Sequence, residues 1–73
     1  MIQVGDQVQA QLPLYFNVNE GTPYVRGTVF WVHPKGRFCR VRFELAGGPV
    51  NETFQIINGV LQDAEPVRKK GRG

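Results

Sequence analysis

Hydrophobic and polar side chains alternate from residue 4 to residue 12. One phase is apolar and the other holds three glutamines: Val4, Val8, Ala10 and Leu12 against Gln7, Gln9 and Gln11. A repeat of two residues is typical of a β-strand that buries one face. Asp6 interrupts the apolar phase, but it follows Gly5, so we expect it in the turn that opens the strand. The pattern predicts a first strand whose glutamines face water.

Four further segments are also typical of short strands. They cover residues 25–33, 38–45, 50–57 and 60–64. Turn-forming residues separate them, at 33–37, at 46–49 and at Asn58-Gly59. We expect the first two of these segments to pair as a hairpin, and the last one to return and pair with the first strand of the chain.

Gly27 lies inside the strand expected over residues 25–33. A glycine within a strand marks a bulge or a sharp bend. Because a bulge shifts the alternation of the residues after it, the register at Gly27 decides which of Phe30 and Trp31 faces outward. The sequence leaves that choice open.

A long connection separates the first two strands. Residues 14–24 are rich in turn formers but also contain Leu14, Tyr15 and Phe16. A fully solvated loop would not need these apolar side chains, so we expect the connection to fold back onto the domain. We place one domain at residues 1–65 and a flexible basic tail at residues 66–73.

Five short strands in 73 residues favour a small all-β barrel over a seven-stranded sandwich. Residues 4–8 (VGDQV), 27–29 (GTV) and 40–43 (RVRF) resemble KOW, Tudor and related SH3-like modules. In those modules a Gly-Asp-x-Val opening starts the first strand, and Gly-x-Val begins the central hairpin. The resemblance covers most of residues 4–62 and implies an all-β, five-stranded, partly open SH3-like barrel.

A weak similarity links the chain to the type II dihydrofolate reductases, SH3-like barrels that assemble as tetramers around a pore. Gly5-Asp6, residues 27–31 and Gln55-Ile56 fall at comparable places. However, that family's Val-Gln-Ile-Tyr surface is Phe54-Gln55-Ile56-Ile57 here, and its pore lysine has no match among residues 9–11. We therefore expect no enzymatic activity.

A third resemblance concerns the origin of the chain. Residues 33–35 and 51–54 resemble parts of small, uncharacterised proteins carried by bacterial phages and conjugative elements. This resemblance implies a bacterial host and an accessory role in DNA transfer or host takeover.

Composition narrows the range of functions. With 73 residues, of which 41% are apolar, the chain can build only a small core, so we expect binding on its outer surface or at an oligomer interface. Cys39 and His33 are the only cysteine and histidine, too few for a disulfide framework or a structural metal site. We expect no cofactor and no membrane span, because no apolar stretch approaches the ~20 residues needed. No leader pattern is visible, so we expect a cytoplasmic protein.

Basic and aromatic residues gather on the expected central hairpin. They are Trp31, Lys35, Arg37, Phe38, Arg40 and Arg42. Because cations attract phosphates and exposed rings stack on bases, this set predicts a face that binds DNA or RNA. The alternative is an ordinary outer face, whose arginines are solvated or paired with Glu44 and Glu52 across the sheet.

The C-terminal tail carries much of the net charge of +3, through Arg68, Lys69, Lys70 and Arg72. We predict that it adds an electrostatic contact to nucleic acid, with a solubilising terminus as the alternative. The competing function is a protein-interaction adaptor, in which residues 14–24 or an open barrel edge receive a peptide or a second copy of the chain. The sequence does not distinguish DNA from RNA and does not fix the oligomeric state.

Overall fold

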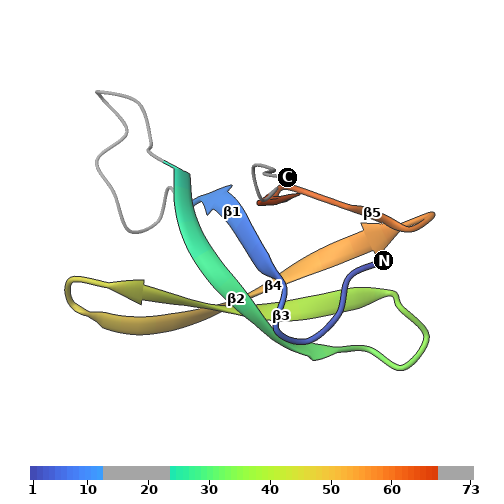
Figure 1. Ribbon diagram of the computed structural model, residues 1–73, viewed down its shortest axis with the longest axis horizontal. Coiled ribbons are helices and arrows are strands. Elements are labelled where there is room, and N and C mark those ends of the chain that lie inside the picture. Colours follow the sequence, from blue (N-terminus) through green and yellow to red (C-terminus); the bar gives the residue numbers. More distant parts are fainter. Residues whose placement is uncertain (13–23, 68–73) are drawn as a thin grey trace, which may run out of the picture.

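Six β-strands make up the regular structure of the part of the chain that the computed structural model describes, residues 1–12 and 24–67. The strands are β1 (Gln7–Gln11), β2 (Tyr24–Val32), β3 (Phe38–Leu45), β4 (Gly48–Ile57), β5 (Val60–Leu61) and β6 (Glu65–Pro66). They form one sheet in the order β5-β4-β3-β2-β1-β6, with every neighbouring pair antiparallel (Figure 1). The described residues contain no helix that could cross a membrane.

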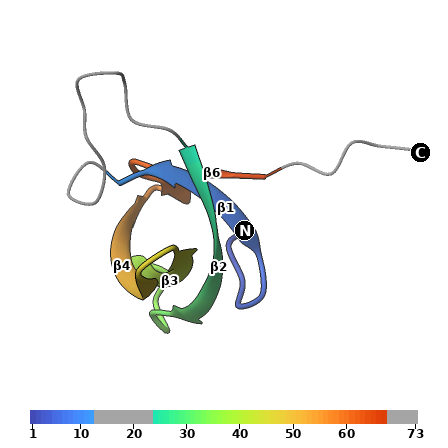
Figure 2. The same ribbon diagram turned by 90° about the vertical axis from the view of Figure 1, so that its left-hand side faces the viewer.

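The sheet curls until it nearly closes into a barrel, as the view in Figure 2 shows. β5 and β6 lie at its two ends, and only residues 62–64 join them. The Gln62 N–H donates to the Gln55 carbonyl at 2.8 Å, and the Val67 N–H donates to the Gln7 carbonyl at 2.9 Å. The expectation of a small all-β barrel is therefore confirmed, and the arrangement is compatible with an SH3-like fold.

The barrel has six strands instead of the expected five. Residues 60–64 do not form one strand against β1. The segment 60–66 divides, so that β5 pairs with β4 and the two residues of β6 pair with Val8 and Gln9 of β1. Asp63, at a φ of 64°, lies in the connection between the two strands. Because of this division, one short segment pairs with both β4 and β1.

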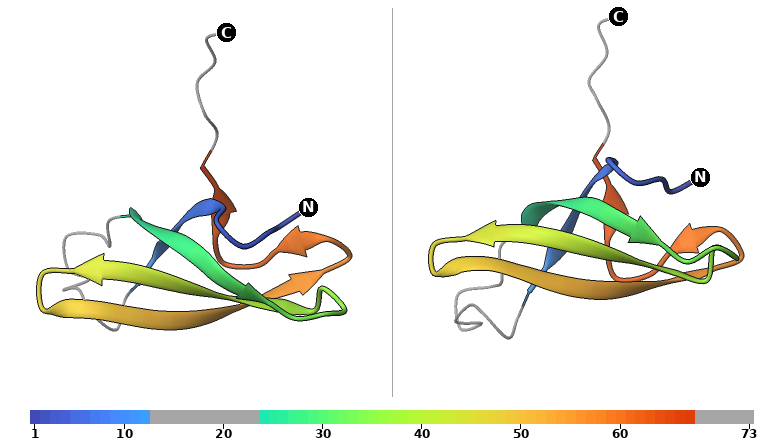
Figure 3. Two further views of the ribbon diagram at one scale, coloured as in Figure 1. Left: turned by 60° about the horizontal axis from the view of Figure 1, so that its bottom comes forward. Right: turned by 90° about the horizontal axis from the view of Figure 1, so that it is seen from below.

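The β3–β4 hairpin is the longest paired element, and its two strands lie side by side in both views of Figure 3. β3 has the bounds predicted from its alternation, while β4 begins two residues earlier than expected. The predicted Asn58-Gly59 turn joins β4 to β5, with φ values of 51° and 79°. Positive φ at both central residues matches a type I′ turn, whose twist suits a hairpin.

The first strand is shorter than its alternation suggests. β1 begins at Gln7, and Val4 is 63% exposed. Asp6 lies in the opening turn as predicted, where its Oδ2 accepts the Gln3 N–H at 2.8 Å. The connection expected over residues 14–24 lies outside the described residues except for Tyr24, which begins β2. Residues 68–73 of the expected tail also lie outside them.

The core is a small apolar cluster contributed by β1, the residue after it, and the three central strands. Its members are Val8, Ala10, Leu12, Val29, Cys39, Val41, Phe43 and Phe54. Phe43 is the largest fully buried side chain, and its ring lies edge-on to Phe54 with centroids 6.1 Å apart. Gly27 makes room for that ring. It is paired regularly with Val8 on one side and Phe43 on the other, so the strand has no bulge at Gly27.

Replacing Gly27 by alanine should destabilise the fold. The added Cβ would lie 2.7 Å from Phe43 Cδ2 and 2.7 Å from Val41 Cγ1. Overpacking of this kind costs about 1–3 kcal/mol, which urea denaturation would report as a lower midpoint. Gly47→Ala is the matched control, because its Cβ would meet nothing within 4 Å. Equal midpoints for the two variants would contradict the packing described here.

Candidate functional site

A β-bulge in β2 determines which side chains reach the outer face of the barrel. Val29 pairs with Val41 and Trp31 pairs with Arg40, which leaves Phe30 as an extra residue in β2. Before the bulge, Gly27 and Val29 face the core. After it the phase is reversed, so Phe30 and Trp31 point outward in succession and each is 40% exposed. The choice that the sequence left open is thus resolved: both rings are on the surface.

The N-terminal turn holds β2 immediately before the bulge. The Gly5 N–H donates to the Val29 carbonyl at 2.8 Å, and the Val29 N–H donates to the Asp6 carbonyl at 2.9 Å. Gly5 takes a φ of 98° there, which favours glycine. These two hydrogen bonds fix Val29 with its side chain buried, so the extra residue is accommodated after it.

Three rings form what we call the aromatic platform: Trp31, His33 and Phe38. The Trp31 and Phe38 centroids are 5.4 Å apart, those of His33 and Phe38 are 4.9 Å apart, and those of Trp31 and His33 are 6.1 Å apart. His33 and Phe38 are half-buried. The platform therefore offers ring surface to solvent while its members support one another.

Arg40 lies beside this platform and next to the Phe30 ring. Its Cζ is 5.6 Å from the centroid of the Phe30 ring, a cation–π arrangement. In the sheet it pairs with Trp31 on one side and Thr53 on the other. Phe30, Trp31, Phe38 and Arg40 together line a shallow recess, which we call the aromatic recess. A flat guanidinium and three rings thus surround one concave patch.

Strands β2, β3 and β4 contain two carboxylates, Glu44 and Glu52. Arg42 Nε donates to Glu44 Oε2 at 3.1 Å, and both side chains are largely exposed, so this pair stabilises the fold by less than about 1 kcal/mol. Glu52 pairs with Val41 and belongs to the half-buried phase of β4, on the opposite face of the sheet from Arg40 and Arg42. Glu44 is therefore the one carboxylate on the outer face of β2, β3 and β4.

The turn between β2 and β3 presents two more cations, Lys35 and Arg37, both exposed. His33 organises this turn: its Nδ1 accepts the Lys35 N–H at 3.0 Å, and its carbonyl accepts the Gly36 N–H at 2.8 Å. The Arg37 carbonyl accepts the Ile56 N–H at 2.8 Å, which fastens the turn to β4. An acceptor Nδ1 gives the imidazole a structural role beside Phe38.

The six predicted hairpin residues thus lie on one outer face and its adjoining turn. Arg68, Lys69 and Lys70, the other predicted contacts, lie outside the described residues. Sequence reasoning missed polar neighbours on this face: Arg26 on β2, and Asn51, Thr53 and Gln55, which pair with Arg42, Arg40 and Phe38. Strand alternation alone could have placed Arg26 on this face. Placing the three β4 residues there required the pairing register of β3 and β4.

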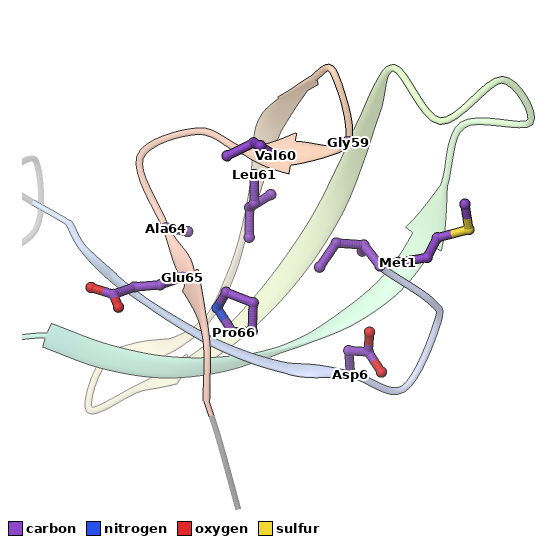
Figure 4. Close-up of a pocket in the computed structure, with 9 residues that line it drawn as sticks. Met1, Asp6, Gly59, Val60, Leu61, Ala64, Glu65 and Pro66 are labelled. Carbon is purple, nitrogen blue, oxygen red and sulfur yellow. The ribbon is translucent and has the colours of Figure 1, made fainter.

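A second recess lies between the N-terminal segment, β5 and β6 (Figure 4). Its lining includes Met1, Leu61 and Pro66 and is mostly apolar. Asp6 and Glu65 border it, but the Asp6 carboxylate accepts the Gln3 N–H, and Glu65 directs its carboxylate away from Met1 in Figure 4. This recess holds no grouped set of reactive side chains.

Across the described residues, no three His, Cys, Asp or Glu side chains are grouped as metal ligands. Cys39 is fully buried in the core, as expected from its strand phase. Comparison of the chain with known protein families, with curated protein sequences and with solved structures found no match. The KOW, Tudor and mobile-element likenesses therefore remain resemblances.

Cys39 should be unreactive in the folded protein. Burial raises the pKa of its thiol, which lowers the thiolate fraction at neutral pH, and the core shields the sulfur from reagents. An aromatic disulfide reagent should label the native chain far more slowly than the chain unfolded in guanidinium at the same pH. Equal labelling rates would show that the core opens on the time scale of the assay.

Proposed function

We propose that this chain is a small, non-enzymatic nucleic-acid-binding module that uses the outer face of the β2–β3 hairpin. The observation that carries the proposal is the bulge at Phe30, which turns Trp31 out of the core and beside Phe38 and Arg40. Bulges commonly re-aim a side chain at a functional surface. If no ligand covered them, two large exposed rings would lose the stabilisation that their burial gives. That loss matters in a chain whose core is small.

Charge supports the same conclusion. Lys35, Arg37, Arg40 and Arg42 lie on the face or at its adjoining turn, and Glu44 is the sole opposing carboxylate among the outward residues of β2, β3 and β4. Cations of this kind bind phosphates, while each base stacked on an aromatic ring adds about 1–3 kcal/mol. The basic residues 68–70 would extend the phosphate contacts.

The setting of this function is part of the proposal. The resemblance to proteins of bacterial phages and conjugative elements favours an accessory role in a bacterial cytoplasm, where nucleic acid is at hand. The recess of Figure 4 is instead suited to an apolar contact, and a protein partner there is the outcome to expect if oligonucleotides do not bind.

Titration of fluorescently labelled oligonucleotides across a salt series tests the proposal. We expect binding at low salt and a logarithmic affinity that falls linearly with the logarithm of salt concentration. Four phosphate contacts give a slope of about −3 on a single strand and somewhat steeper on a duplex. An absence of binding at low salt, or an affinity independent of salt, refutes the proposal.

A pair of charge variants tests the role of the hairpin face. Arg40→Gln should weaken binding and make the salt slope shallower by about 1, because one phosphate contact is lost. Glu44→Gln should tighten binding, because Arg42 loses its competing carboxylate. Both side chains are exposed, so thermal unfolding should be nearly unchanged and serves as the control. Weaker binding by Glu44→Gln would argue against this face.

A further inference from the structure

We propose that the ligand is a single strand, and that one unpaired base occupies the aromatic recess formed by Phe30, Trp31, Phe38 and Arg40. This inference rests on the proposed function and specifies its substrate class. A duplex hides the faces of its bases within the stack, whereas an unpaired base can lay its face against a ring. The recess presents ring surface, which a duplex backbone could not use.

The bulge supplies the apolar part of the recess. Phe30 and Trp31 point outward together, and Trp31 rests against Phe38 at 5.4 Å with the ring planes tilted by 44°. Rings held at an angle in this way leave a concave surface. One flat aromatic group of the size of a base fits the chemistry of such a surface.

Arg40 supplies the polar part. Its guanidinium is held near Phe30 by the 5.6 Å cation–π contact and carries planar donors that can bind a base edge or a phosphate. Thr53 and Gln55 pair with Arg40 and Phe38 across the β3–β4 ladder and add polar side chains to the same face of the sheet. The base would therefore meet apolar faces and hydrogen-bonding groups together.

Cations lie on both sides of the recess along the chain. Lys35 and Arg37 precede Phe38 at the turn, and Arg42 follows Arg40 two residues further along β3. A strand with one base in the recess could place a phosphate near a cation in each direction. The arrangement suits a ligand whose charges flank a flat apolar unit.

Charge also argues against the other common occupant of an aromatic recess, a methylated ammonium group. Recognition of such a cation by rings is favoured where the surroundings are neutral or acidic. Here Arg40 forms part of the wall, and Glu44, the carboxylate on this face, is already paired with Arg42. An entering cation would be repelled, whereas a polyanion would be attracted.

Trp31 is the only tryptophan of the chain, so its emission reports on the recess directly. Short oligothymidine, a duplex of equal length and an abasic oligonucleotide with the same number of phosphates should be titrated at one salt concentration. We expect oligothymidine to quench Trp31 and to bind about 5- to 150-fold more tightly than the abasic strand, the factor expected for one stacked base. The duplex should bind more weakly than oligothymidine and leave the emission unchanged.

Variants localise the base. Phe30→Ala should weaken oligothymidine binding far more than abasic binding, since it removes a stacking surface while the basic side chains that contact phosphates are kept. Val60→Ala, an exposed apolar residue on β5, is the matched control and should change neither. Trp31→Phe should retain most of the affinity and Trp31→Ala should lose it, and the circular dichroism of each variant confirms folding.

The outcomes separate the two proposals. Duplex binding as tight as oligothymidine binding, without quenching, overturns the single-strand inference and leaves the proposed function standing. No binding of any oligonucleotide at low salt overturns both. Quenching by a trimethyl-lysine peptide, with no oligonucleotide bound at low salt, also overturns both, and identifies the recess as a cation site.

Discussion

The extra residue in β2 is the constraint on which the outer surface depends. Val29 is fixed in the core by its two hydrogen bonds to the N-terminal turn, and Val32 returns to the inner side further along the strand. Regular alternation between them would turn Trp31 inward. The bulge at Phe30 instead places Phe30 and Trp31 beside Arg40. The bulge therefore determines both which aromatic side chains are left out of the core and which side chains are exposed on the outer face of the hairpin.

A small core explains the rest of the fold. Phe43 fits in it only because Gly27 has no side chain. β5 and β6, each two residues long, then bring the ends of the sheet together. A chain of this size has little interior for a ligand pocket. The candidate binding residues accordingly lie on the outside of β2, β3 and the turn between them.

Much of the fold could be predicted from the sequence, because local patterns determine it. The unbroken alternation of residues 38–45 gave the bounds of β3, and Asn58-Gly59 forms the turn that its conformational preferences favour. The division of residues 60–66 into β5 and β6 could not be predicted, because two-residue strands carry no periodic signal. The bulge position was also hidden, since it depends on contacts between Val29 and residues 5 and 6, far away in sequence. Without the bulge, the outward direction of Trp31 could not be assigned.

The candidate site joins features that each have an ordinary explanation alone: solvated arginines, an exposed tryptophan and a tight turn. Their meeting around Arg40, on a face with one carboxylate, is the basis of our proposal that together they bind a polyanion with flat apolar units. Chemical-shift mapping of the isotope-labelled chain with a short single-stranded oligonucleotide tests this most directly. The account predicts that the largest shifts fall on the Trp31 indole N–H and on residues 30–42. Shifts centred on the N-terminus, β5 and β6, or none at saturating ligand, would contradict it.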